Sequence, residues 1–152
     1  MSRSAEMAKD IPDGPWVVAQ GDYNGRPLFA RINTGARGMA GDPGYGHRVG
    51  VAVPLLDPNA DGLPGPEESA QLDEVEQKLV PALTSGGTAV FVLAITTSGM
   101  REFVFYTSKP AAVEPCLQRV SALVETHELE HVVEEDPAWV VFEQFARSTD
   151  VA

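Results

Sequence analysis

Strand and helix signals follow one another in a regular order after residue 46, and this order restricts the fold more than any other feature of the sequence. Short β-branched or alternating apolar runs indicate strands, and an apolar stripe at intervals of three and four residues indicates a helix. The segments are a strand at 47–56, a helix from about residue 66, strands at 88–97 and 101–106, a helix from about residue 110 and a strand at 130–134. This βαββαβ order is typical of ferredoxin-like domains. We therefore expect an α+β fold whose antiparallel or mixed sheet carries helices on one face.

Two further elements flank this core. Strand-like runs at 16–33 are separated by Asn24-Gly25, a dipeptide typical of hairpin turns. Near the end of the chain, Asp136-Pro137 is a cap followed by a favoured first helical residue. We therefore expect an added N-terminal β-hairpin and a short C-terminal helix. The strand at 101–106 alternates, which places Phe103 and Phe105 on one face and the even-numbered residues on the other.

The length of 152 residues fits one domain. We expect this domain to span residues 14–148, with a flexible N-terminus at 1–13 and a flexible tail at 149–152. The Gly-rich segment at 35–46 matches neither phosphate-binding loop pattern, and no helix signal follows it. We interpret it as a mobile connection.

The charge of the chain bears on its partners. Its 22 acidic residues against 11 Lys and Arg give a net charge of −11. Contacts to phosphates need clustered basic residues, which this sequence lacks, so we expect no nucleic-acid partner. The single cysteine, Cys116, fits a reducing compartment. No apolar run approaches the roughly 20 residues that span a bilayer, so we expect no membrane association and a cytoplasmic location.

The segment from Asp57 to Glu68 matches the calcium-loop pattern D-x-[DN]-x-[DN]-G-x5-E. Asp57, Asn59 and Asp61 would supply oxygens at loop positions one, three and five. Glu68 would supply the bidentate carboxylate, and Gly62 the sharp turn. This pattern predicts a site for Ca²⁺ or Mg²⁺. The alternative is a solvated turn between a strand and a Pro-initiated helix.

A second metal pattern, H-E-x-x-H, spans His127 to His131. In zinc peptidases this pattern requires a helix, so that both imidazoles reach one ion. Here the segment lies where a helix should end and the last strand begin. In a strand the two histidines would be about 13 Å apart and would not share an ion. We therefore do not favour the zinc-peptidase interpretation.

Acidic residues gather near the end of the chain. They are Glu125, Glu128, Glu130, Glu134, Glu135 and Asp136. A solvated surface explains such a cluster. The alternative is a contact patch for a basic protein, which would associate by electrostatic steering and weaken with salt.

Four segments in this order resemble a known family. They are Leu28–Asn33, then Gly62-Leu63-Pro64 ahead of a helix with Leu72 and Glu76, then Thr97–Tyr106, and finally Asp136-Pro137-Ala138-Trp139. The chain resembles the bacterial family called domain of unknown function 695, over residues 14–146. The closing Asp-x-x-Trp segment and the element order are also similar to ribonuclease E inhibitor B-type proteins, which are small acidic proteins that act by protein contact.

The resemblance implies no activity, but it implies candidate site residues. The polar positions that match the family are expected to converge on the sheet, either as a binding site or as cross-strand pairs. With the closing tryptophan, the candidate binding residues are Arg31, Asn33, Arg101, Glu102, Tyr106 and Trp139. The resemblance also implies that Gly62-Leu63-Pro64 serves loop shape.

We therefore expect a non-enzymatic cytoplasmic domain that binds another protein as a regulator or inhibitor, and a basic protein is the candidate partner. The sequence contains no assembled catalytic constellation, although it leaves open whether the protein is an enzyme. The alternative is a small-molecule-binding domain or metal-assisted hydrolase with a site between the sheet and the Gly-rich segment. A deep pocket holding Arg31, Arg101 and a carboxylate would favour the alternative, and a flat sheet face would favour the protein partner.

Overall fold

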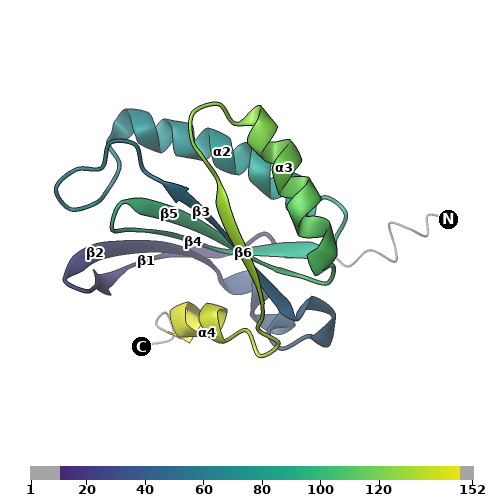
Figure 1. Ribbon diagram of the computed structural model, residues 1–152. Helices are drawn as coiled ribbons and strands as arrows, with labels where there is room; N and C mark the ends of the chain where they lie inside the picture. The colour runs from purple at the N-terminus through teal and green to yellow at the C-terminus, as the bar shows by residue number, and fades with distance from the viewer. Residues whose placement is uncertain (1–10, 148–152) are drawn as a thin grey trace.

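The computed structural model describes residues 11–147, and its centre is a six-stranded antiparallel sheet (Figure 1). The strand order across the sheet is β1-β2-β4-β5-β3-β6, and every neighbouring pair is antiparallel. The strands are β1 (Trp16–Tyr23), β2 (Arg26–Asn33), β3 (His47–Pro54), β4 (Ala89–Thr97), β5 (Met100–Thr107) and β6 (Glu130–Glu135). The predicted α+β class is thus confirmed.

The predicted N-terminal hairpin forms, and the strands at 89–97 and 100–107 form a second one. β1 and β2 are joined at Asn24 and Gly25, whose φ angles of 53° and 82° suit the primed turns that match strand twist. β4 and β5 are joined in the same way at Ser98 and Gly99, with φ angles of 53° and 81°.

Helices α2 (Pro66–Thr84) and α3 (Val113–Leu123) cover one face of the sheet (Figure 1). A 3-10 turn, η3 (Pro110–Ala112), leads into α3. α2 begins at the predicted proline and has acidic residues in its first turn, where they complement the helix dipole. Its apolar stripe is fully or almost fully buried, and each such side chain contributes about 1.5–3 kcal/mol. The stripe consists of Leu72, Val75, Leu79 and Leu83.

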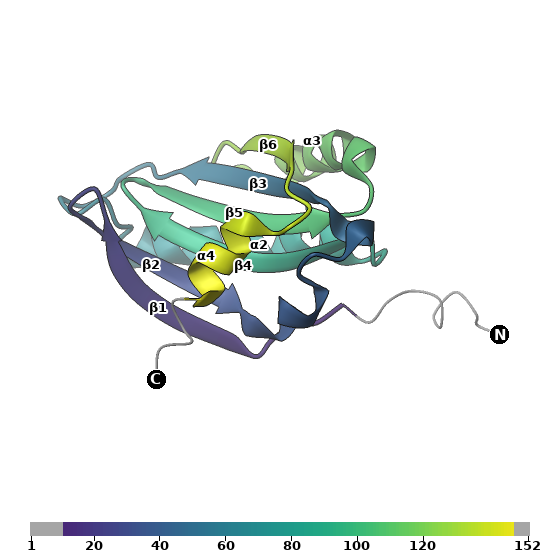
Figure 2. The same ribbon diagram turned by 90° about the horizontal axis from the view of Figure 1, so that it is seen from below.

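The opposite face is also covered, which corrects the expectation of helices on one face. Helix α4 (Val140–Arg147) lies across it, together with the 3-10 helices η1 (Thr34–Met39) and η2 (Pro43–Tyr45) (Figures 1 and 2). Phe142 of α4 is fully buried there. The Gly-rich segment is therefore a folded layer: Ala36, Met39 and Tyr45 are buried against the sheet.

The alternation predicted for β5 explains how the two layers share one sheet. Phe103 and Phe105 pack toward α2 and α3, and Val104 and Tyr106 pack toward α4. β4 is buried from Ala89 to Ile95 without a break, as expected for a strand between two packed layers.

The predicted flexible ends fall largely outside the described residues, at 1–10 and 148–152. Residues 11–13 of the predicted flexible N-terminus are described. There Pro12 accepts a hydrogen bond from Asn33, and Ile11 packs against the α4 side of the sheet. Within 11–147, no helix is both long enough and apolar enough to cross a membrane.

Candidate functional site

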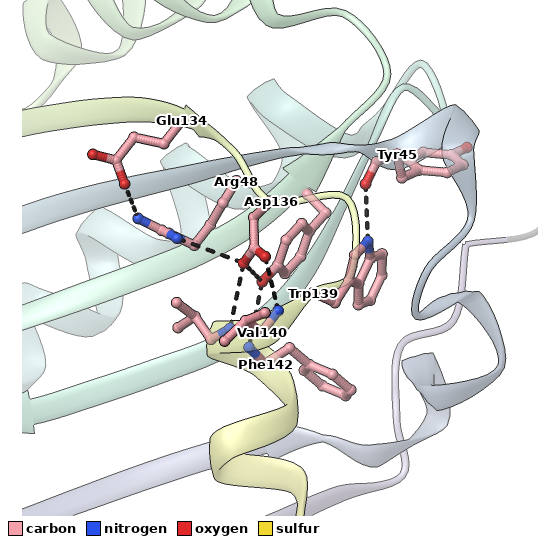
Figure 3. Close-up of polar contacts among 9 residues, drawn as sticks. Tyr45, Arg48, Glu134, Asp136, Trp139, Val140 and Phe142 are labelled. Carbon is pink, nitrogen blue, oxygen red and sulfur yellow. Dashed lines mark hydrogen bonds and ion pairs between the residues drawn. The ribbon is translucent and has the colours of Figure 1, made fainter.

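Tyr106 and Trp139 meet inside the protein, where both side chains are fully buried. Figure 3 shows Trp139 next to the start of α4. Their rings stack at 4.1 Å between centroids and 7° between planes. The indole Nε1 of Trp139 donates to the carbonyl of Tyr45 at 2.9 Å. Trp139 has a φ of 58°, a strained value for a tryptophan, and these contacts hold it there. Both predicted binding residues are therefore fully buried, and their role in binding stays a prediction.

Asp136 joins this pair to α4 (Figure 3). The Tyr106 hydroxyl donates to its Oδ2 at 2.7 Å, and the backbone amides of Val140 and Val141 donate to its carboxylate at 2.8 and 3.3 Å. Arg48 lies 3.5 Å from the same Oδ2 and also pairs with Glu134. The carboxylate thus satisfies the first amides of the helix, as a cap does.

These contacts also set the protonation of the pair. Burial by itself raises the pKa of Asp136, but the Val140 amide and the Tyr106 hydroxyl donate to the carboxylate, and its pKa lies below the ordinary value. Burial, together with the bond to this carboxylate, raises the pKa of Tyr106. The hydroxyl therefore keeps its proton and remains a donor.

Asn33, another predicted binding residue, is also fully buried. Its amide nitrogen donates to the carbonyls of Pro12 and Phe91, both at 2.9 Å, and its oxygen accepts from the Gly14 amide at 3.0 Å. The side chain therefore fastens the segment before β1 to β2 and β4.

Arg31 and Arg101 do come together, in a groove on the α2 side of the sheet. The groove has a volume of about 260 Å³. Its lining residues come from four strands: Val18, Phe29, Ala30, Arg31, Ala94, Thr96 and Arg101. The groove is smaller than the roughly 300–1,000 Å³ of common ligand pockets. It lies on the opposite face from the Gly-rich segment, where the alternative prediction had located a site.

Arg31 is held by α2. Its guanidinium pairs with both carboxylate oxygens of Glu76, one of them at 3.3 Å from Nη1. The same guanidinium lies 5.8 Å from the ring centroid of Trp16, within range of a cation–π contact. Arg31 thus has partners on two sides, Glu76 and Trp16.

Arg101 is more deeply buried and less well paired. Its side chain is 15% exposed, and its Nε donates to the Thr96 hydroxyl at 2.8 Å. Nη1 lies 3.8 Å from Oδ1 of Asp73 on α2. Burial and the charge of Arg31 lower the pKa of Arg101, whereas Asp73 and Glu76 act in the opposite direction.

Asp73 and Glu76, the two carboxylates of α2 that pair with these arginines, were not identified as site residues from the sequence. Asp73 and Glu76 are three positions apart, so they lie on one side of the helix. They also flank the apolar stripe that faces the sheet. An acidic pair beside a buried stripe, with arginines on the strands below, is the signal that predicts these ion pairs.

Glu102 does not join the groove. It follows Arg101 directly, and successive residues of a strand point to opposite faces. Its carboxylate lies over Gly50 of β3, where an added Cβ would meet Oε2 at 2.4 Å. Burial raises the pKa of Glu102, and the nearby charge of Arg48 opposes this effect.

Two residues of the calcium-like loop, Glu68 and Asn59, use their side-chain oxygens in internal hydrogen bonds. Both Glu68 oxygens accept backbone amides, from Leu56 and Asp57. The Asn59 Oδ1 accepts from the amides of Asp61 and Leu63, at 2.8 and 3.0 Å. Ca²⁺ or Mg²⁺ binding here stays a prediction, and an ion would have to compete with these bonds.

The H-E-x-x-H segment is not a helix. His127 lies in the loop after α3, and His131 lies in β6. The His127 ring is buried and contacts Glu68 and Thr126 at 2.7 and 2.9 Å. Among residues 11–147, no group of three or more His, Cys, Asp or Glu side chains is arranged to hold a metal.

One of three comparisons with known proteins, a scan against family models, agrees with the predicted resemblance. Neither the curated proteins nor the solved structures contain a match to this chain. A family model does match: it covers residues 14–146, which include all six strands and nearly all of α4. The similarity to ribonuclease E inhibitor B-type proteins stays a prediction. The chain belongs to the family of unknown function DUF695.

Proposed function

We propose that this protein is a non-enzymatic binding domain that takes an extended segment of another protein beside β1. The observation that carries the proposal is the character of this edge strand. β1 lies at one end of the sheet and exposes 70% of Val18 and 53% of Tyr23. An exposed, apolar edge is a template for strand addition, in which main-chain hydrogen bonds supply affinity and side chains supply specificity.

The two edge strands of the sheet differ in how well they are protected against pairing with another chain. β6, at the other edge, has four charged or titratable residues among six: Glu130, His131, Glu134 and Glu135. Such residues discourage pairing with another chain. β1 has only Asp22 as a charged residue among eight. The difference supports β1 as the binding edge.

Charge favours a basic partner over a second copy of this chain. Two copies would bring together net charges of −11 each, and like charges oppose association. Most of the predicted acidic cluster is exposed, in the loop before β6 and along this strand, although Asp136 is a buried cap. These exposed carboxylates would steer a basic protein toward the domain. Bound in this way, the domain would act as a regulator or inhibitor.

We also propose that β3, α2, β4, β5, α3 and β6 form a ferredoxin-like core. The order β4-β5-β3-β6, the antiparallel pairing and the position of both helices on one face support this assignment. The β1–β2 hairpin then extends the sheet beyond β4 and creates the binding edge.

Matched edge variants test the proposed function. Val18→Lys puts a charge on β1, and Val132→Lys puts the same charge on β6, where Val132 is 41% exposed. We expect a protein captured from lysate by the wild type to be lost at high salt and with Val18→Lys, but retained with Val132→Lys. Hydrogen exchange of the complex should show new protection in 16–23. A partner that survives Val18→Lys, or recovery of small molecules alone, would overturn the proposal.

A further inference from the structure

We infer that the groove holding Arg31 and Arg101 binds the carboxylate of a small anionic ligand, with Arg101 as the main donor. This site lies on the α2 face of the sheet and shares Val18 with the β1 edge, but it does not depend on strand addition there. The inference rests on the donors of Arg101, the neighbouring charges and the apolar lining of the groove.

Arg101 has unused hydrogen-bond capacity. A guanidinium carries five N–H donors. Nε is used by Thr96, and the ion pair from Nη1 to Asp73, at 3.8 Å, is too long for a hydrogen bond. Within the described part of the chain, these are the contacts of the Arg101 guanidinium, so its terminal nitrogens can still donate.

The charges around Arg101 favour an incoming anion. Arg31 lies close enough for its positive charge to oppose that of Arg101. Glu76 binds Arg31 through both oxygens and is therefore committed. A carboxylate between the arginines would form charge-assisted bonds to Arg101 and reduce the repulsion between the two cations.

Asp73 would compete with a ligand carboxylate for Arg101. Its side chain is 66% exposed, so its attraction to Arg101 is screened by water and it can turn into solvent. The position of Asp73 also indicates which functional group a ligand would use, because its carboxylate already approaches Arg101 from the side of α2 that faces the groove. A planar ligand carboxylate can replace it with two parallel hydrogen bonds.

The remaining lining restricts the body of the ligand. Phe29 and Ala94 are apolar, and Val18 adds a third apolar side chain. With a volume of about 260 Å³, the groove suits a small acid with a short apolar body. 3-Phenylpropionate is a suitable probe, and its neutral amide is the matched control.

Titration of the folded protein by ¹H–¹⁵N NMR with these two compounds tests the inference. We expect 3-phenylpropionate to shift resonances of the groove and the amide to leave them unchanged. Asp73→Asn, which removes the competitor, should tighten binding about threefold. Arg101→Gln should weaken it about tenfold or more. Arg119→Gln, a change at an exposed arginine on α3, should have no effect.

The same titrations can overturn the inference. Equal binding of the acid and the amide, or tighter binding of inorganic phosphate than of the carboxylate, would contradict it. Weaker or unchanged binding in Asp73→Asn would do so as well, and this variant keeps the test valid if Arg101→Gln fails to fold. Capture of a protein partner should persist in Asp73→Asn, which separates this site from the β1 edge.

Discussion

The Nε2 atom of His127 lies 2.7 Å from Oε2 of Glu68, although the two residues are 59 positions apart. The contact joins the loop after α3 to the first turn of α2, and the His127 side chain has no exposed surface. Glu68 also accepts the amides of Leu56 and Asp57, so one carboxylate fastens three segments. Removing such a partner leaves a buried charge unsatisfied, which is costly.

Glu68 should make the stability of the protein depend on acid pH. Burial by itself raises its pKa, but the hydrogen bonds from Leu56, His127 and Asp57 outweigh burial, and the pKa lies below the ordinary value. A depressed pKa contributes stability that is full above the unfolded value, about 4.3, and is lost as pH falls through the folded value. We expect the urea midpoint of the wild type to fall as the pH is lowered below about 4.3.

Glu68→Gln isolates this contribution. The variant should be less stable than the wild type at pH 7 and should lose less stability on acidification. Glu67→Gln, at the exposed neighbouring position, is the control and should follow the wild type. Identical pH profiles for Glu68→Gln and the wild type would show that the pair contributes nothing to the acid response.

Much of the fold could be predicted because its signals are local. Asn24-Gly25, Pro66 and Asp136 mark a turn and two helix starts, and each acts through its own backbone or its near neighbours. The second layer was missed although the sequence contained a signal for it. The apolar run from 89 to 95 does not alternate, and a strand of this kind needs cover on both faces.

The site could be predicted only in part, because its contacts are non-local. Arg31 and Arg101 were predicted as partners in a site and do share a groove. Tyr106 and Trp139 were also predicted to bind; they stack in the core, and a role in binding stays a prediction for both. Glu68 and His127 matched two different metal patterns, and sequence spacing alone does not reveal that they bind each other.

Tyr106→Phe should destabilise the protein without changing its shape. The hydroxyl donates to Asp136 and accepts from the Phe142 amide at 3.3 Å, so its removal leaves buried groups without their partner. We expect a loss of about 1–3 kcal/mol in the free energy of unfolding, measured by urea titration. Tyr23→Phe is the control, because Tyr23 is exposed at the β1–β2 turn. Equal stability of both variants would contradict the structural role of the Tyr106 hydroxyl.

Gly62→Ala should be more destabilising than Gly25→Ala. Both glycines have a φ of 82°, which costs a residue with a Cβ about 1–2 kcal/mol. An added Cβ meets nothing within 4 Å at Gly25, but at Gly62 it would lie 3.0 Å from Ser98 Cα and from the Gly99 amide. Urea unfolding should show a larger loss at position 62. Equal losses of stability in the two variants would mean that the close approach of Gly62 to the β4–β5 turn does not contribute to stability.

Calcium and magnesium titrations test the loop from Asp57 to Glu68. Glu68 is already bound by His127 and two amides, and Asn59 by the amides of Asp61 and Leu63. An ion at these ligands would have to break internal hydrogen bonds before it formed its own contacts. We therefore expect metal-stripped protein to give no binding heat and no shift in melting temperature at millimolar Ca²⁺ or Mg²⁺. A saturable heat in the wild type that disappears in Asp57→Ala would instead establish a cation site at this loop.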